Sequence, residues 1–171
     1  SRSKADLEKA NAESGLEKTR QMRVNHPILT TKLVSAERDY IQAEELMRRT
    51  AYDRAYVSFT QVNAQIEEFS QLVEAKIATQ EMYDNFLIRV DELKPSKHLK
   101  PEAYDEAFDA ASAGKQFLME GSFTASESKL KEATDKLQEL SDAIEQFVQT
   151  NSALGHRYIA QGQGAKAIEA F

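Results

Sequence analysis

The sequence contains no cysteine and no tryptophan, and its 171 residues include only 6 glycines and 3 prolines. The lack of cysteine excludes disulfides, thiolate zinc sites and a cysteine nucleophile. Scarce glycine and proline mean few turns, and therefore long helices. No apolar run approaches the roughly 18 residues that a membrane span needs, and no signal peptide is visible. The compartment therefore stays unknown, because cytoplasm and periplasm are both compatible with these absences.

Basic residues are outnumbered, with 22 Lys and Arg against 28 Asp and Glu, and the formal net charge is -6. An acidic chain disfavours nucleic acids and anionic membrane surfaces as partners. The hydrophobic share of 41% is enough for a packed core. The chain opens at Ser1 rather than methionine and stops at Phe171 inside a predicted helix. We therefore expect a fragment of a longer protein.

Apolar residues recur every three or four positions through most of the chain, which predicts amphipathic helices. A proline at position 27 suits the first turn of a helix, and two further prolines interrupt the periodicity before the second half. The predicted parts are a polar N-terminal helix or extension over 1–26, a helical hairpin over 27–93, a linker over 94–100, a second hairpin over 101–150 and the start of a third, truncated hairpin over 151–171.

The second helix of each hairpin is expected to be unusually long. In the first hairpin, either one helix runs on to about Leu93 or a break falls near Thr79, and the single helix is favoured. The residues predicted to lie on the buried faces are Leu33, Ala36, Tyr40, Ala43, Leu46, Tyr52, Ala55, Phe59, Val62, Ile66, Phe69, Val73, Ile77, Tyr83, Leu87, Val90, Tyr104, Ala107, Phe108, Ala111, Gly114, Phe117, Phe123, Leu130, Ala133, Leu137, Leu140, Ile144 and Phe147.

The two hairpins match each other at a constant shift of 71 residues, which is the separation of Phe59 and Leu130. Shared helical periodicity alone would align some positions, so the turn is the better evidence. Thr50 aligns with Gly121, and both lie between two apolar stripes. The sequence therefore predicts two copies of one unit, a helix, a turn and a long helix.

The end of the chain carries a recognisable pattern, made by Leu154, Gly155, Tyr158, Ala167 and Phe171. Their order, L-G-x2-Y followed by A-x3-F, resembles a tetratricopeptide repeat. The same spacing recurs upstream at Ala43, Leu46, Ala55 and Phe59, and again at Gly114, Phe117, Ser126 and Leu130. The pattern departs from the family at Asn151, where tryptophan is usual. In the first two copies, the second helix is also longer than that of an ordinary repeat. The expected fold is all-α, with antiparallel helical hairpins in a tetratricopeptide-like solenoid or an elongated helical bundle.

No constellation of residues predicts catalysis, a metal or a cofactor. The three histidines, His26, His98 and His156, have no second ligand at a metal-binding helical spacing. His26 and His98 lie beside prolines, where an exposed histidine is expected. Phosphate-binding glycine loops and nucleophile elbows are not found either. The chain is therefore predicted not to be an enzyme.

The family resemblance implies a scaffold for multiprotein complexes that binds a peptide or helix on a concave helical surface. The residues that we expect to contact the partner are Gln42, Asn151, His156, Arg157 and Gln161. The alternative is a coiled-coil or helical-bundle spacer next to an unseen functional domain. In that case the heptad-like run from Phe59 to Val90 would pair with a second copy as a homodimer.

Overall fold

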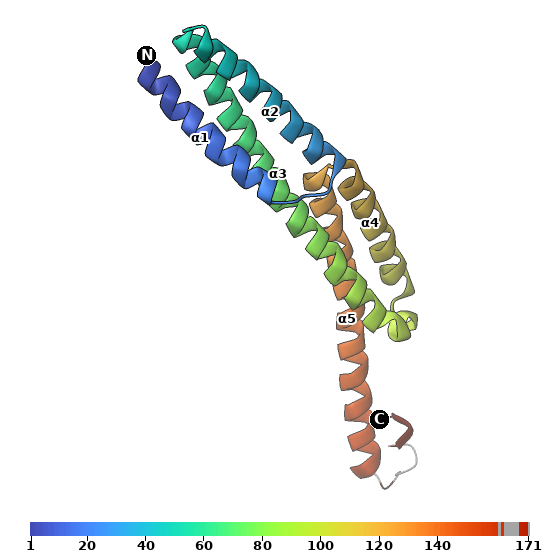
Figure 1. Ribbon diagram of the computed structural model, residues 1–171. Coiled ribbons are helices and arrows are strands. Elements are labelled where there is room, and N and C mark those ends of the chain that lie inside the picture. Colours follow the sequence, from blue (N-terminus) through green and yellow to red (C-terminus); the bar gives the residue numbers. More distant parts are fainter. Residues whose placement is uncertain (161, 163–167, 171) are drawn as a thin grey trace. The chain divides into compact units, whose positions relative to one another are not determined.

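The computed structural model describes residues 1–160, 162 and 168–170, and these residues form helices and turns without a strand. The all-α class expected from the sequence is confirmed (Figure 1). The elements are α1 (Arg2–Gln21), α2 (Pro27–Arg48), α3 (Tyr52–Leu93), the 3-10 helix η1 (Lys94–Leu99), α4 (Pro101–Glu120) and α5 (Phe123–Ala160). The single long helix favoured over 52–93 is therefore also confirmed.

The chain divides into two compact units, and α3 contributes to both. The first unit contains residues 1–80 and the turn at 117–124, and the second contains residues 81–116 and 125–171. This division falls inside α3 and not at the linker expected over 94–100. That linker is the 3-10 helix η1.

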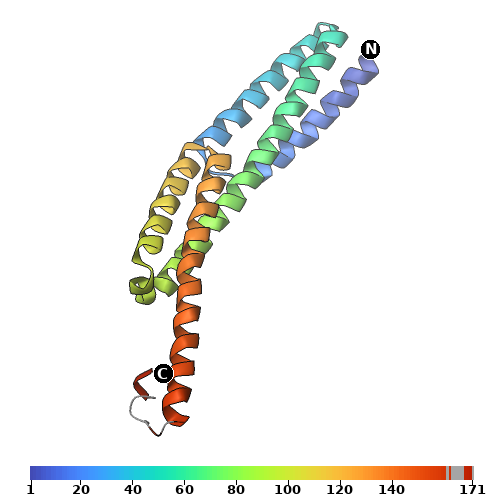
Figure 2. The same ribbon diagram turned by 180° about the vertical axis from the view of Figure 1, so that it is seen from behind.

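Three helices form the first unit: α1, α2 and the part of α3 up to Gln80. Both views of the ribbon show them side by side, with each helix antiparallel to the next along the chain (Figures 1 and 2). Their core has two clusters. One is centred on Phe59 and contains Ala5, Ala12, Ala43, Ala55 and Val62. The other contains Leu29, Phe69, Val73, Leu118 and Phe123.

Helix α1 packs closely although its apolar stripe is thin. Leu16 is its only large fully buried side chain, and small residues let the backbone approach α3. A Cβ built on Gly15 would lie 3.0 Å from Cγ2 of Ile66. Polar contacts complete the docking: the Tyr40 hydroxyl donates to Glu13 at 2.6 Å, and the Asn63 amide donates to Glu8 at 2.7 Å. The N-terminal segment is therefore an integral helix of the unit.

The second unit repeats this arrangement with the end of α3, α4 and the first part of α5. The core contains Phe86, Val90, Tyr104, Ala107, Ala110, Ala111, Leu130, Ala133, Leu137 and Leu140. Where α4 and α5 meet, Ser126 Oγ donates to the carbonyl of Gly114 at 2.7 Å. A Cβ on Gly114 would lie only 2.9 Å from Cγ of Leu130, so this position has no room for a side chain.

The turns of the two hairpins have the same hydrogen bonds at the predicted shift of 71 residues. Thr50 and Gly121 both have positive φ, 58° and 83°. In the first turn the N–H groups of residues 50 and 51 donate to the carbonyls of residues 47 and 46, and in the second those of 121 and 122 donate to 118 and 117. Both turns close a helix by the Schellman pattern. The following helices start at Tyr52 and Phe123, again 71 residues apart.

His26 is buried, so the expectation of an exposed histidine at this position is wrong. The residue is 7% exposed, and its ring caps α2, with Nδ1 accepting from the N–H of Ile28 at 3.2 Å. The other ring nitrogen therefore carries the proton and donates to the carbonyl of Leu118 at 3.0 Å. The ring also meets Phe123 edge-on at 5.4 Å. His98, in contrast, is exposed as expected.

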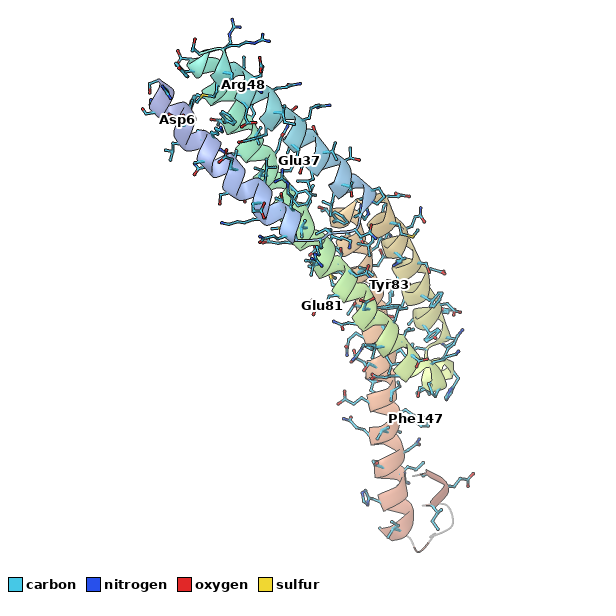
Figure 3. All side chains as sticks on the ribbon, in the orientation of Figure 1. Asp6, Glu37, Arg48, Glu81, Tyr83 and Phe147 are labelled. Carbon is cyan, nitrogen blue, oxygen red and sulfur yellow. The ribbon has the colours of Figure 1, made fainter. Side chains whose placement is uncertain are left out.

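Several side chains predicted to be buried are exposed instead. Ile77 is 59%, Leu87 41%, Phe108 50% and Phe147 50% exposed. Phe147 lies on the later part of α5, which continues past η1 (Figure 3). The helix start expected at Asn151 is also wrong, because α5 runs through this position to Ala160. A helix needs no break where its sequence keeps strong helix formers, and no glycine or proline occurs between Phe123 and Leu154.

Candidate functional site

The second unit has an open groove of about 640 Å³ between the end of α3 and α4. Val90 and Tyr104 form its buried floor. Its walls contain three large apolar side chains that remain exposed to solvent: Leu87 (41%), Ile88 (61%) and Phe108 (50%). Three large apolar side chains thus gather on one surface without burial in the chain's own core.

Acidic side chains border this groove on the α3 side. Asp91 and Glu92 line it, with Lys94 as the one basic residue among its lining residues. In the described part of the chain neither of these two carboxylates has an ion-pair partner. Exposed Glu81 lies on the same helix, almost three turns before Asp91 (Figure 3). The formal charge of residues 81–92 is -3, from four acidic side chains and one arginine.

Two lysines of the neighbouring elements have partners within the second unit, whereas Lys94 of η1, which lines the groove, has no ion pair among the described residues. Lys97 of η1 contacts Asp105 at 2.8 Å, and its ammonium lies 4.9 Å from the centre of the Tyr104 ring. The hydrogen bond to Asp105 raises the pKa of Lys97. Lys115 of α4 lies 4.9 Å from the centre of the Tyr83 ring. These two cations already have partners, and Asp91 and Glu92 leave the α3 side of the groove acidic.

The first unit has a groove at the equivalent place, but it is much smaller, about 150 Å³. Five of its lining residues are equivalent, at the shift of 71 residues, to lining residues of the open groove. They are residues 19, 20, 23, 33 and 37, which correspond to 90, 91, 94, 104 and 108. Here Arg20 bridges the helices. Its guanidinium contacts Glu37 at 2.9 Å and Glu17 at 3.8 Å (Glu37 is labelled in Figure 3).

The second unit has different chemistry at these three positions. Glu17, Arg20 and Glu37 of the first unit correspond to Ile88, Asp91 and Phe108 of the second. The polar bridge is thus replaced by two apolar side chains and one unpaired carboxylate. An aliphatic and an aromatic side chain at these positions cannot form an ion pair. They are available for burial against another surface.

The residues expected from the sequence to contact a partner do not form one site within a single unit. Gln42 is exposed on α2 in the first unit, whereas Asn151, His156 and Arg157 lie on α5 in the second. Asn151 is half-buried, and His156 and Arg157 are exposed. Gln161 lies outside the described residues.

The residues predicted to be packing positions of the repeat are mostly buried or half-buried where the structure describes them. Ala43, Ala55 and Phe59 are buried, and Leu46 is half-buried against them. Gly114 and Leu130 are buried and Phe117 is half-buried. In the last copy Gly155 is buried and Leu154 is half-buried, and Gly162 has the positive φ of a turn. The Tyr158 side chain, Ala167 and Phe171 lie outside the described residues.

The groove residues were missed because Leu87 and Phe108 fit the apolar stripes of their helices and were assigned to the core. A comparison of the two sequence copies could have identified these groove residues. At the shift of 71 residues, Ile88 and Phe108 are apolar where the first copy has glutamate. A solvated position that becomes apolar in one copy indicates a contact that the other copy lacks.

Among the described residues, no group of three or more His, Asp or Glu side chains is arranged to hold a metal ion. None of the helices in this part of the chain has an apolar stretch sufficient to cross a membrane.

Comparison of the chain with protein-family models, curated proteins and solved structures found no match.

Proposed function

We propose that this chain is a non-enzymatic scaffold that binds a partner protein, and that the groove between α3 and α4 of the second unit is its binding surface. The observation that carries the proposal is the exposure of Leu87, Ile88 and Phe108 together along one open groove. Single exposed apolar residues need no explanation, but a contiguous set with polar borders is typical of interaction sites. Aromatic anchors in such a set often dominate binding energy.

The comparison of the two units supports the proposal. The same groove in the first unit is crossed by the Arg20–Glu37 ion pair, and it exposes no aromatic side chain. The packing of this helical unit therefore does not itself require an exposed aromatic residue at position 108. Its presence in the second unit is better explained by a partner than by the fold.

The alternative function, a spacer that dimerises through the run from Phe59 to Val90, has less support. Phe59, Val62, Phe69 and Val73 are buried in the first unit. Phe86 and Val90 are buried in the second. A second chain would have to displace the intramolecular contacts of these residues, at a cost of several kcal/mol for each large side chain. Light scattering over a concentration series tests this: a mass near 19.3 kDa is expected, and a concentration-independent dimer would favour the spacer.

The direct test of the groove uses site-specific photocrosslinking. A benzoylphenylalanine in place of Phe108 is compared with the same residue in place of Glu37, the equivalent position of the closed groove. We expect a discrete crosslinked protein from position 108 only. That protein is then purified, and its affinity for the unmodified chain and for Phe108→Glu is measured. Equal crosslinking from both positions, or binding that Phe108→Glu leaves unchanged, would contradict the proposal.

A further inference from the structure

We infer that the groove of the second unit takes a basic amphipathic helix, with its apolar side chains on Leu87, Ile88 and Phe108 and its Lys or Arg side chains over the acidic rim of α3. This inference rests on the proposed function and adds the chemistry of the partner. It commits to a helical segment of another protein as the occupant.

The shape of the site favours a helix over an extended peptide. The described residues contain no strand, so there is no sheet edge to which a peptide strand could be added. Two neighbouring helices instead form a groove with apolar residues along both walls, Leu87 and Ile88 on α3 and Phe108 on α4. An amphipathic helix fills such a groove with side chains at positions i, i+3 or i+4, and i+7.

The charge of the rim selects a basic partner. Asp91 and Glu92 border the apolar residues without ion-pair partners in the described chain, and residues 81–94 carry a formal charge of -2 with Lys94 of the groove lining included. Positive side chains flanking the partner's apolar face would meet this rim, which raises the association rate and disfavours acidic competitors. The equivalent position of Asp91 in the first unit, Arg20, has the opposite charge and is already paired with Glu37.

The same charges argue against a second copy of this chain as the occupant. The whole chain has a formal net charge of -6. The exposed apolar residues of α5, such as Phe147 and Val148, lie in a segment, residues 145–160, whose one acidic and one basic side chain cancel. That segment offers the rim no excess positive charge. A basic helix from another protein is the better complement.

The test uses two designed helical peptides with the same leucine-rich apolar face. One has Lys and Arg on its polar face, and the other has Glu and Asp. Binding to the full chain is measured by fluorescence anisotropy at low and high salt. We expect the basic peptide to bind at least tenfold more tightly than the acidic one, and this preference to shrink as salt screens the charges.

Two variants locate the binding. Phe108→Ser should weaken both peptides, because it removes the apolar anchor. Asp91→Lys with Glu92→Lys should weaken the basic peptide at least fivefold. The matched control, Glu74→Lys with Asp135→Lys, changes the net charge equally at exposed positions outside the groove, and it should change the affinity less than twofold. Circular dichroism confirms that each variant is folded.

The outcomes separate this inference from the proposed function. If both peptides bind equally and Phe108→Ser weakens both, the groove binds helices but the charge selection is wrong. If the control reduces binding as much as the rim variant, general attraction to an acidic chain explains the result, and the inference fails. Absence of binding by either peptide also overturns it, and the crosslinking experiment then decides on the groove itself.

Discussion

The two units of this chain build the same three-helix arrangement from different surface chemistry. In the first, Glu17, Arg20 and Glu37 form a polar bridge across the groove between the first two helices. In the second, the equivalent residues are Ile88, Asp91 and Phe108, and the groove is open. The cores remain alike: Phe59 and Leu130, or Ala43 and Gly114, are buried at equivalent positions. The repeat therefore keeps the same packing while its two surfaces differ.

The turns give the largest expected difference between the two hairpins. Replacing Gly121 with Thr, the residue of the first turn, should lower the free energy of unfolding by roughly 3 kcal/mol. The backbone there has φ of 83°, and a new Cβ would lie 2.8 Å from Cγ2 of Ile28 and 3.1 Å from Cε1 of His26. Urea unfolding measures the loss. Gly162→Thr is the control, because its φ is 74° and nothing lies within 4 Å of an added Cβ. Equal effects of both substitutions would contradict the packing argument.

The first unit also differs from the second by its buried histidine, His26. His26→Ala removes the cap of α2 and leaves the Leu118 carbonyl without its donor, so it should destabilise by about 2 kcal/mol. Asn at this position can still cap the helix, and His26→Asn should lose less. The equivalent residue of the second unit is the surface Lys97, and Lys97→Ala should leave the urea midpoint unchanged within error. A larger effect of Lys97→Ala would reverse the comparison.

The grooves can be exchanged to test whether three residues decide which one is open. The triple variant Glu17→Ile, Arg20→Asp and Glu37→Phe gives the first unit the surface residues of the second. If these residues are sufficient, the variant should bind two basic peptides per chain instead of one, as measured by calorimetry. Ile88→Glu, Asp91→Arg and Phe108→Glu should weaken binding at least tenfold, about 1.4 kcal/mol. Unchanged stoichiometry in the first variant would mean that other residues shape the groove.

The first turn should gain stability from the residue of the second. Thr50 is a β-branched residue with φ of 58°, a conformation that glycine adopts without strain. Thr50→Gly should therefore raise the free energy of unfolding by about 1 kcal/mol. Asn, which tolerates this backbone region, should give part of the gain. A loss of stability in Thr50→Gly would show that the threonine side chain makes a contact worth more than the strain.

High pH should destabilise the first unit through a group that the second lacks. Burial, the hydrogen bond to Glu13 and the charges of Glu44 and Glu13 raise the pKa of Tyr40 well above its ordinary value. The equivalent residue in the second unit is Ala111.

The folded state therefore retains the Tyr40 proton at a pH where the unfolded chain has lost it, so stability falls as pH rises above about 10. The unfolding free energy of Tyr40→Phe should fall less steeply than that of the wild type between pH 9 and 11. Since lysines also titrate in this range, the difference between the two proteins, and not the slope of either, is the measurement. Parallel curves would contradict the prediction.

Local sequence signals predicted the fold well where they depended on periodicity and turn chemistry. The pairing of Thr50 with Gly121 located both turns, and the even stripe from Phe59 to Val73 gave the long helix. The burial of His26 could not be predicted, because its partner Leu118 is 92 residues away in the sequence. The boundary expected at residue 151 was wrong for a different reason, since no glycine or proline interrupts the sequence there and α5 continues through this position.

The groove was harder to predict than the core, because a stripe of apolar residues does not say which of them the chain itself covers. Leu87 and Phe108 have the spacing of core residues and are half-exposed, whereas Phe86, outside the predicted stripe, is buried. On α3 and α4, the apolar residues span a wider part of the helix surface than the neighbouring helices cover. Only the packing of α3 against α4 determines which edge of that arc remains open.

The continuity of α3 through both units has a consequence for how such a chain can lengthen. Because one helix ends the first unit and begins the second, each additional unit needs only two new helices. Consider a tandem duplication of 71 residues that starts and ends inside the long helices. Its junction would connect two equivalent helical positions, so the helix would continue and no new loop would be needed. Genes for chains of this design can therefore gain or lose whole units in one recombination event, while each copy remains free to change its surface.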